Sequence, residues 1–350
     1  MTRFERCLSV LENRIPDRVP VVPENYAFCV KHCGYKMKDV RHDGNLLAEC
    51  LIRTLEDFGY DGVTVDLDNA ASAEALGCRV DFSEEDNPAI VSGPAIESLE
   101  EVKDLKIPEP YKDGRLHVYI ECTRRLAREI GKDAFIYAFF DQGPFSLAAM
   151  VRGIENFMLD LAMRENLELI HQLIDFCRQA GEIFGKALID AGAHVVGIGD
   201  ALASPDVISP RQYEEFAFPY ERRMAENIQK EGGRFGIHIC GNVTPILPKL
   251  VQTGAVLLDI DYKADLKEVK RICRGKVAVR GPIEPSSVMC FGTQKVVEEK
   301  CREAIEILGK NGGFILSSGC DIMKGTPPEN MAAMVQAALK YGHYQISERR

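Results

Sequence analysis

Tryptophan is absent from this chain of 350 residues, and no apolar run approaches the ~20 residues that a membrane-spanning helix requires. Basic residues are in deficit, with 43 Lys and Arg against 53 Asp and Glu, which gives a net charge of -10. Nucleic acids and anionic membranes are bound by clustered cations, so neither is the expected partner. The first residues contain no apolar signal core, so the twelve cysteines are expected to be free thiols in a reducing cytoplasm.

Two nucleotide-binding loops are also missing. The chain has no Gly-x-Gly-x-x-Gly turn and no Gly-x-x-x-x-Gly-Lys-Ser/Thr loop. Their absence disfavours a doubly wound open sheet, which is the second architecture that alternating strands and helices allow. With 46% hydrophobic residues, the chain can bury one large core.

What the sequence does contain is a regular alternation of short apolar strands and amphipathic helices. The predicted strands are 19–24, 62–67, 134–141, 194–200, 234–241, 256–261, 276–281 and 313–318. The predicted helices are 4–11, 44–58, 116–130, two or three within 145–191, and 210–230, 265–273, 293–309 and 328–341. Eight strands alternating with helices predict an α/β fold, a (β/α)8 TIM barrel formed as a single domain over residues 1–350.

One segment interrupts this alternation. Residues 77–112 contain two short β-like runs, 78–82 and 89–92, followed by the proline-rich stretch 108–110. Two short runs close together predict a hairpin. We therefore expect an insertion in the loop that follows the second strand.

In a TIM barrel the chemistry is carried by residues at the carboxyl ends of the strands. Each predicted strand ends in an identifiable polar residue, so the mouth of the barrel can be read from the sequence. The set is Glu24, Asp66 with Asp68, Asp141 with Gln142, Asp200, His238 with Cys240, Asp261, Arg280 and Cys320. This mouth is rich in carboxylates and metal ligands.

His238 and Cys240 are the strongest candidates for metal ligands. Side chains alternate along a strand, so both point to the same side of the run Phe235 to Gly241. Cys320 follows another predicted strand and can meet them at the mouth. One imidazole and two thiolates favour zinc, and ligands drawn from separate strand ends leave a coordination position open, as in catalytic sites.

Two carboxylates are candidate catalytic residues. Asp200 can act as a fourth ligand, as a general acid or base, or as a partner of His238, but an aspartate at this place is equally typical of a helix cap. Glu24, at the end of the first predicted strand, is a weaker candidate of the same kind. Arg280 can hold an anionic substrate or belong to a surface ion pair, and the sequence does not decide between these roles.

A zinc site of this composition is suited to alkyl transfer. Zinc keeps a bound thiol in its anionic form at neutral pH, and it also polarises an ether oxygen so that the oxygen becomes a better leaving group. In the first case a thiolate attacks a methyl group, and in the second an ether loses one. The residues alone do not set the direction.

The chain resembles the uroporphyrinogen decarboxylase-like superfamily and, within it, the zinc-dependent corrinoid (cobalamin) methyltransferases. The shared segments are Pro16 to Val21, Gly143 to Phe145, Gly199 with Asp200, Ser209 with Pro210, His238 to Gly241, Gly319 to Ile322 and Thr326 to Asn330. The resemblance implies a (β/α)8 barrel, Zn2+ held by His238, Cys240 and Cys320, and methyl exchange between a small molecule and the cobalt of a corrinoid protein. The small molecule is then a methyl ether or a thiol such as coenzyme M.

The corrinoid must come from a partner protein, because the Asp-x-His-x-x-Gly segment of a corrinoid-binding module is missing. Two departures count against tetrapyrrole decarboxylation. The segment Val21 to Phe28 lacks the arginines of the decarboxylases, and Ser318-Gly319-Cys320 stands where they have Gly-His-Gly. A metal-free decarboxylase that uses Asp66 or Asp68, and a non-catalytic corrinoid- or tetrapyrrole-binding protein, remain as alternatives.

Overall fold

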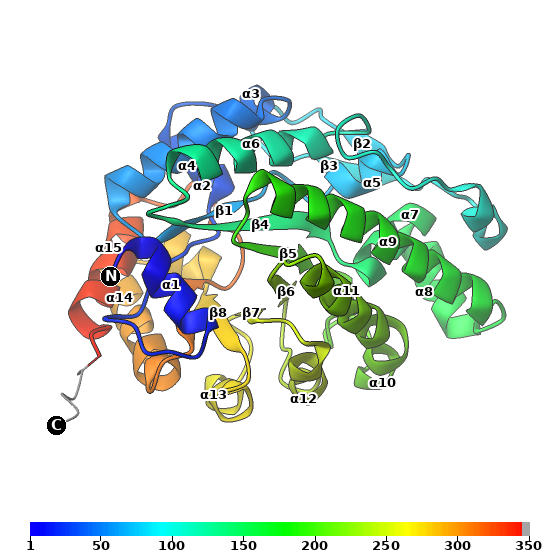
Figure 1. The fold of residues 1–350 in the computed structure, drawn as a ribbon. Helices are drawn as coiled ribbons and strands as arrows, with labels where there is room; N and C mark the ends of the chain where they lie inside the picture. Colours follow the sequence, from blue (N-terminus) through cyan, green and yellow to red (C-terminus); the bar gives the residue numbers. More distant parts are fainter. Residues whose placement is uncertain (345–350) are drawn as a thin grey trace.

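Seven parallel strands form the curled sheet at the centre of the molecule (Figure 1). The computed structural model describes residues 1–344, and residues 345–350 of the predicted domain lie outside the described part. Neighbours in the sheet follow one another along the chain, apart from an insertion between the first two. The strands are β1 (Gly62–Val65), β4 (Phe135–Gln142), β5 (Val195–Gly199), β6 (Phe235–Ile239), β7 (Leu257–Ile260), β8 (Ala278–Ile283) and β9 (Phe314–Ser318).

The segment 19–24 closes the barrel between β9 and β1. Val21 forms a parallel bridge with Leu316 of β9, and the N–H of Asp61, next to β1, donates to the Val21 carbonyl over 2.7 Å. The prediction of a regular strand here is wrong, since the two prolines of the segment have no N–H to donate. The result is a TIM-barrel-like α/β fold in one domain, with an extended segment in place of the first strand.

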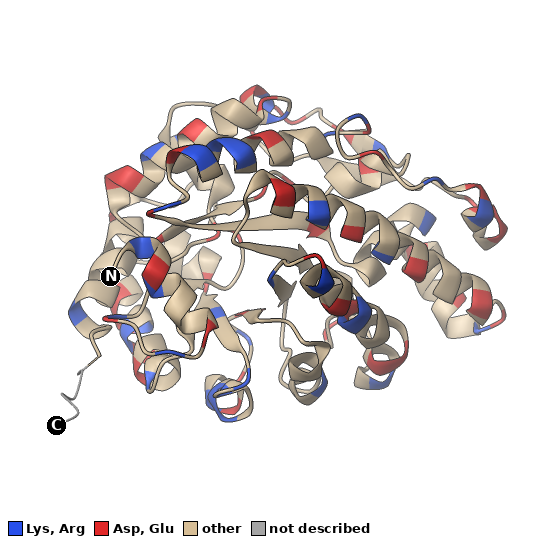
Figure 2. Cartoon of the chain, viewed as in Figure 1, with Lys and Arg blue, Asp and Glu red and all other residues tan. Residues whose placement is uncertain are grey.

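Helices surround the sheet (Figure 1). The longer ones are α1 (Arg3–Leu11), α4 (Gly44–Phe58), α6 (Leu116–Glu129), α7 (Pro144–Arg152), α8 (Ile154–Met163), α9 (Leu167–Ala191), α11 (Phe218–Lys230), α13 (Leu266–Cys273), α14 (Gln294–Ala304) and α15 (Pro328–Tyr341). Figure 2 shows basic and acidic residues interspersed along these helices, as expected for amphipathic helices that face solvent. Among residues 1–344, every helix is too short or too polar to cross a membrane.

Short helices link these elements, and most of them were not predicted. They are α2 (Tyr26–His32), α3 (Met37–Val40), α5 (Ala71–Ala75), η1 (Leu99–Asp104), η2 (Ala201–Ala203), α10 (Pro210–Gln212), η3 (Tyr213–Ala217), α12 (Leu247–Leu250), η4 (Val251–Thr253), η5 (Pro285–Cys290) and η6 (Ile305–Gly309). Of these, α10 and η3 lie within the helix predicted at 210–230, and η6 within that at 293–309. The others have at most seven residues, too few for a periodic pattern to reveal.

The predicted insertion after the second predicted strand is present. It contains an antiparallel hairpin of β2 (Arg79–Asp81) and β3 (Ile90–Gly93). The N–H of Ala95, just after β3, donates to the carbonyl of Val151 in α7 over 2.9 Å. This bond fixes the hairpin beside the helix that follows β4, on the mouth side of the barrel.

Tyr137 fills the centre of the barrel. Its ring is fully buried, and its hydroxyl donates to the Asp259 carboxylate over 2.9 Å. Gly197 and Gly236, on the adjacent strands β5 and β6, make room for this ring, since a Cβ at either position would overlap the tyrosine hydroxyl. The barrel is therefore a packed core and not a passage.

A network of ion pairs closes the opposite end of the barrel, below the amino ends of the strands. Asp61 is fully buried and accepts hydrogen bonds from Arg6, from both terminal nitrogens of Arg18 and from the Val21 N–H, at 2.6 to 2.9 Å. Arg6 also binds Asp17. This network joins α1 and the closing segment to the start of β1.

Candidate metal centre

His238 and Cys240 lie at the carboxyl end of β6. Their side chains point the same way because they are two residues apart on an extended backbone. His238 Nε2 lies 3.1 Å from Cys240 Sγ. Gly241 then turns the chain with φ at 84°, in the region that favours glycine, and its N–H donates to Asp261 Oδ2 over 2.8 Å. Asp261 thus holds the turn that presents Cys240.

Cys320 follows β9, which is separated from β6 by two strands in the sheet. The curl of the barrel brings it to the other two residues. The ligand atoms of His238, Cys240 and Cys320 all lie within 4.8 Å of one another. The preceding Gly319 allows this approach, because a Cβ there would come within 2.9 Å of the Tyr262 nitrogen.

The second ring nitrogen of His238 lies against a backbone carbonyl. Nδ1 is 3.3 Å from the carbonyl oxygen of Asp259, on the neighbouring strand β7. A proton on Nδ1 leaves Nε2, the nitrogen beside Cys240, with its lone pair free. Metal-binding histidines are oriented in this way, with the other ring N–H donated to a carbonyl or carboxylate.

The protonation of the three side chains is interdependent. Burial disfavours a charged His238, but hydrogen bonding to Cys320 and the nearby Glu24 carboxylate raise its pKa to about 10. The pKa of Cys320 is raised well above its ordinary value by hydrogen bonding to Cys240 and by burial, although His238 opposes this. A metal binds the deprotonated forms, so its binding here would release protons.

The three residues fit zinc. In a tetrahedral zinc site with bonds of about 2.0 to 2.3 Å, neighbouring ligand atoms lie roughly 3.3 to 3.8 Å apart. The spread of up to 4.8 Å is close to that spacing. One imidazole and two thiolates form the set that zinc prefers, and a fourth position is left for another ligand.

Glu24 lies at the mouth of the barrel, on the closing segment. It is 7% exposed, and its Oε2 is 3.4 Å from Nη2 of the buried Arg280. Its carboxylate raises the pKa of both His238 and Cys320. Its backbone carbonyl accepts from the Ile322 N–H over 2.7 Å, which joins the closing segment to the loop that carries Cys320.

Asp200 has a different environment. It is fully buried, and its carboxylate accepts from the Ser146 N–H at 2.7 Å, the Ser146 hydroxyl at 2.6 Å and the Phe145 N–H at 3.3 Å. Burial raises its pKa to about 6, although these bonds oppose the shift. Its side chain therefore caps the first turn of α7. Its backbone N–H donates to the His238 carbonyl over 2.8 Å, so Asp200 contacts the cluster through its main chain.

The remaining carboxylates of the predicted mouth form a second group beside β1 and β4. Asp68 pairs with the buried Arg115, and Tyr119 donates to Asp66 Oδ1 over 3.2 Å. Asp141 accepts from the Ser72 N–H over 2.7 Å, and burial raises its pKa to about 7. Burial and nearby carboxylates, Glu24 foremost, also raise the pKa of Asp66.

Two residues near the cluster escaped sequence reasoning. Asp259 orients His238 through its carbonyl, receives the Tyr137 hydroxyl and lies with its Oδ1 3.2 Å from Arg280 Nη1. The sequence signal that could have identified Asp259 is its position as a charged residue within the apolar run of β7. Asp321 follows Cys320, and its buried Oδ1 has no hydrogen-bond partner.

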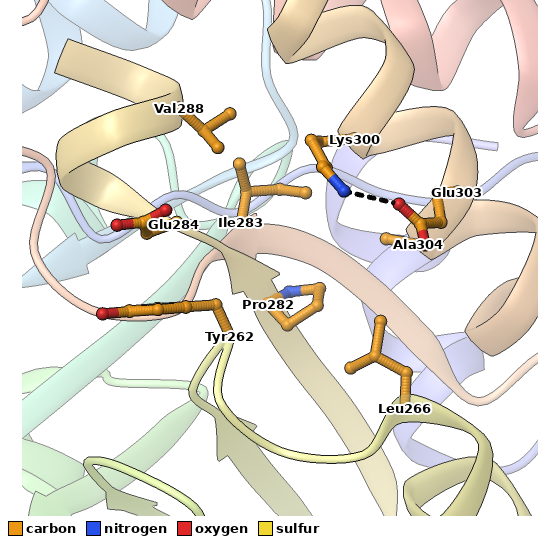
Figure 3. A pocket seen from close by; sticks show the side chains of 9 residues that line it. All are labelled: Tyr262, Leu266, Pro282, Ile283, Glu284, Val288, Lys300, Glu303 and Ala304. Carbon is orange, nitrogen blue, oxygen red and sulfur yellow. Dashed lines mark hydrogen bonds and ion pairs between the residues drawn. The ribbon is translucent and has the colours of Figure 1, made fainter. Parts of the chain in front are cut away.

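A separate pocket of about 310 Å³ lies on the outer side of β8 (Figure 3). Tyr262 and Glu284 stand at one end, and the Lys300–Glu303 ion pair stands at the other. None of the three candidate metal ligands lines it. The cluster and this pocket are therefore distinct features.

Known proteins resemble this chain over most of its length. The methylcobamide:CoM methyltransferase MtbA of Methanosarcina acetivorans is 26% identical over 344 residues, covering 97% of this chain and 98% of that protein. The uroporphyrinogen decarboxylase of Prochlorococcus marinus is 29% identical over 290 residues, covering 81% of this chain and 80% of that protein.

The fold has a close match among solved structures. A methyltransferase from Methanosarcina mazei superposes with a TM-score of 0.88 at 24% identity, covering 97% of this chain and 99% of that one. The profile of the family described as Uroporphyrinogen decarboxylase (URO-D) matches residues 2–341. The chain therefore belongs to the uroporphyrinogen decarboxylase (URO-D) family.

Proposed function

We propose that this protein is a zinc-dependent methyltransferase that exchanges a methyl group between a small molecule and the cobalt of a separate corrinoid protein. The observation that carries the proposal is the convergence of His238, Cys240 and Cys320 within 4.8 Å at the barrel mouth. The small molecule is a methyl ether or a thiol such as coenzyme M.

The relatives support the choice of methyl transfer over decarboxylation. The methylcobamide:CoM methyltransferase MtbA of Methanosarcina acetivorans matches 97% of this chain, whereas the decarboxylase of Prochlorococcus marinus matches 81%. Two buried arginines near the carboxyl ends of the strands also favour methyl transfer. Arg280 is paired with Glu24 and Asp259, and Arg115 with Asp68, so neither is free to bind the carboxylates of a tetrapyrrole.

Zinc bound at this site would supply a Lewis acid that keeps a thiol deprotonated or polarises an ether oxygen. The methyl group moves between the heteroatom and cobalt without its bonding electrons. When the small molecule is the donor, the carbon–heteroatom pair stays on the heteroatom, and Co(I) provides the pair for the new cobalt–carbon bond. In the reverse direction, a thiolate provides the pair and cobalt returns to Co(I).

The chain's own residues hold the ligands and move the proton. The Asp259 carbonyl keeps His238 in the tautomer that presents Nε2. We assign to Glu24 the transfer of the proton that a thiol loses or a leaving oxygen gains, since it is a carboxylate at the barrel mouth, held beside Arg280, and its negative charge raises the pKa of both His238 and Cys320. Asp200 is a positioning residue, because its carboxylate is bound to the start of α7.

The test is to measure zinc and methyl transfer on the same preparation. We expect about one zinc per chain, methyl transfer between a corrinoid and a small thiol or methyl ether, loss of transfer on chelation and recovery on adding zinc. A zinc-free wild-type protein with full activity would overturn the proposal. Turnover of uroporphyrinogen that resists chelation would instead assign the decarboxylase reaction.

A further inference from the structure

Three cysteines gather where α2 packs against α4, outside the candidate metal centre (Figure 1). Cys29 lies on α2, Cys33 follows one turn later at the end of that helix, and Cys50 lies on α4. The twelve cysteines of the chain are all free thiols, and nine of them are buried. The three that are partly exposed are Cys240, Cys320 and Cys33. Cys33 is therefore the accessible thiol outside the proposed zinc site.

Cys33 and Cys50 are in contact across the two helices. Cys33 Sγ lies 3.7 Å from the carbonyl oxygen of Cys50, and a hydrogen bond joins the two thiols. The hydroxyl of Thr54, one turn further along α4, donates to the same carbonyl over 2.7 Å. Cys50 is fully buried. Cys33 is thus the member of the pair that solvent reaches.

Cys33 also lies where the backbone leaves its helix. It is the C-cap residue of α2, and Gly34 follows with φ at 85°, the left-handed conformation that commonly ends a helix. A Cβ at Gly34 would meet nothing within 4 Å, so this turn borders open space. A disulfide bond is only about 2.05 Å long, so two sulfurs in hydrogen-bonding contact must move together to form one. The end of a helix frays more readily than its interior, so the Cys33 side supplies that movement.

The surroundings of Cys33 favour its thiolate. The hydrogen bond with Cys50 lowers the pKa of Cys33, burial opposes the shift, and the Thr54 hydroxyl and the charges of Arg53 and His32 add to the lowering. The same hydrogen bond, together with burial, raises the pKa of Cys50. One sulfur of the pair is therefore the nucleophile, while the other keeps its proton. Thiolates react with oxidants, whereas thiols are nearly inert.

We propose that Cys33 and Cys50 form a reversible disulfide when Cys33 is oxidised by a peroxide, which makes this pair a thiol-modification site. Cys33 is the thiol that reacts first, and Cys50 is the thiol that resolves the product. An accessible thiol beside a second cysteine is the arrangement found in oxidation-sensitive pairs. The inference is independent of the proposed methyl transfer, because neither residue belongs to the His238, Cys240 and Cys320 cluster.

The oxidation is balanced with hydrogen peroxide as the oxidant. The Cys33 thiolate attacks one peroxide oxygen, the O–O bond breaks, and the departing hydroxide takes up the proton that the thiol had lost. Cys33 is then a sulfenic acid. The Cys50 sulfur attacks the Cys33 sulfur, the S–O bond breaks, and the departing hydroxide takes the Cys50 proton. The two thiols together lose two electrons, and the peroxide is reduced to two molecules of water.

Cys29 is the competing partner for Cys33, since it lies one turn earlier on the same helix. Its side chain is fully buried, and its Sγ lies 3.9 Å from the hydroxyl oxygen of Tyr60. The hydrogen bonds of this thiol go to the hydroxyls of Tyr60 and Thr54, and burial raises its pKa to about 12. These contacts favour Cys50 over Cys29 as the partner of Cys33.

Peptide mapping of the oxidised full-length protein tests the inference. The reduced protein is treated with a small excess of hydrogen peroxide, its remaining thiols are blocked with N-ethylmaleimide, and it is digested with trypsin. Trypsin cleaves after Lys31 and Lys36, so the three cysteines fall on three different peptides. We expect a cross-linked peptide pair that contains Cys33 and Cys50 and has lost two hydrogens. Dithiothreitol should return both peptides to their free forms.

Three variants define the order of the steps. Cys50→Ala should leave Cys33 as a sulfenic acid that dimedone traps, and Cys33→Ser should abolish both the dimedone adduct and the disulfide. Cys122→Ala is the matched control at a buried thiol of α6 whose pKa burial raises, and it should form the disulfide as the wild type does. Circular dichroism checks that each variant is folded. The wild-type peptide map stands on its own if Cys50→Ala does not fold.

Three results of the wild-type map would each overturn the inference. They are a disulfide between Cys29 and Cys33, a sulfinic acid at Cys33 without any disulfide, and a Cys33 that stays unmodified. Cys240 and Cys320 fall on other tryptic peptides, so their oxidation is read separately. Oxidation confined to those two residues would also count against the proposed pair.

Discussion

Charged side chains are buried at both ends of this barrel, but the two ends differ in how completely these side chains are hydrogen-bonded. At the amino ends of the strands, the Asp61 carboxylate receives four hydrogen bonds from Arg6, Arg18 and a backbone N–H. At the carboxyl ends, the buried Oδ1 atoms of Asp259 and Asp321 lack a hydrogen-bond partner. Asp259 Oδ1 and Arg280 Nη1 lie 3.2 Å apart, but not in hydrogen-bonding geometry.

The difference separates stability from function within one fold. A buried charge whose partners are complete stabilises a single arrangement, and removing one partner is costly. Incompletely bonded polar atoms around a cluster of thiols and an imidazole are retained where a ligand or reacting group completes them. The closed end should therefore respond to mutation in its stability, and the mouth in its chemistry.

The largest expected effect is at the mouth. Cys320→Ala removes one of three proposed ligands, so zinc content should fall from about one per chain to near zero and methyl transfer should become undetectable. Atomic emission and the methyl-transfer assay measure these. Cys301→Ala, at a buried thiol of α14, is the control that should keep its zinc. Zinc retained in Cys320→Ala would show that Cys320 is not a zinc ligand, and would contradict the functional role given to the mouth.

The next effect is at the closed end. Asp61→Asn leaves the buried Arg18 without a charged partner and leaves Arg6 with Asp17 alone, so the free energy of unfolding should fall by about 3 to 5 kcal/mol. Urea unfolding measures it, and zinc content should not change. Asp57→Asn, on the surface of α4, should shift stability by less than about 0.5 kcal/mol. Equal effects of the two changes would show that the network adds no stability.

A smaller effect depends on pH. Burial and the charge of Arg234 lower the pKa of His194, at the start of β5, to about 4. The unfolded chain takes up this proton near pH 6.5 and the folded chain only near pH 4, so stability is present above pH 6.5 and is lost as pH falls. Between pH 7 and pH 4, the wild type should lose about 2 to 3 kcal/mol more than His194→Gln. Parallel stability curves for the two proteins would contradict this.

The smallest expected effect concerns Asp200, a carboxylate at the mouth that accepts hydrogen bonds from Phe145 and Ser146. Ser146→Ala removes the hydroxyl that donates to Asp200 and accepts from the Leu202 N–H, so the protein should lose about 1 to 2 kcal/mol of stability. Methyl transfer at saturating substrate should stay at the wild-type rate. A large loss of activity without loss of stability would instead make Asp200 a participant in the chemistry.

Much of the fold follows from local patterns. The seven strands of the central sheet are short, largely buried apolar runs, and such runs are visible in the sequence. The predicted strand 276–281 begins and ends two residues before β8. The strand continues to Ile283, because beyond Arg280 it pairs with β9 alone and one side of the backbone is free.

The site was only partly readable. Alternation along a strand placed His238 beside Cys240, and the barrel hypothesis placed Cys320 near them. Which carboxylates face the cluster depends on packing, which no local pattern reports. The Asp200 carboxylate binds the start of α7, whereas the Glu24 carboxylate, on the closing segment, pairs with Arg280. Asp259 orients His238 through its backbone carbonyl, and a backbone contact cannot be predicted from the types of side chain in the sequence.

The buried ring of Tyr137 leaves this barrel with a single entrance. Under the proposed reaction, a large corrinoid protein and a small methyl carrier both approach the site through the mouth of the barrel. The small methyl carrier has to bind first, because the corrinoid protein covers the mouth when it docks. Turnover therefore follows a compulsory order, and the small-molecule product leaves only after the corrinoid protein has dissociated.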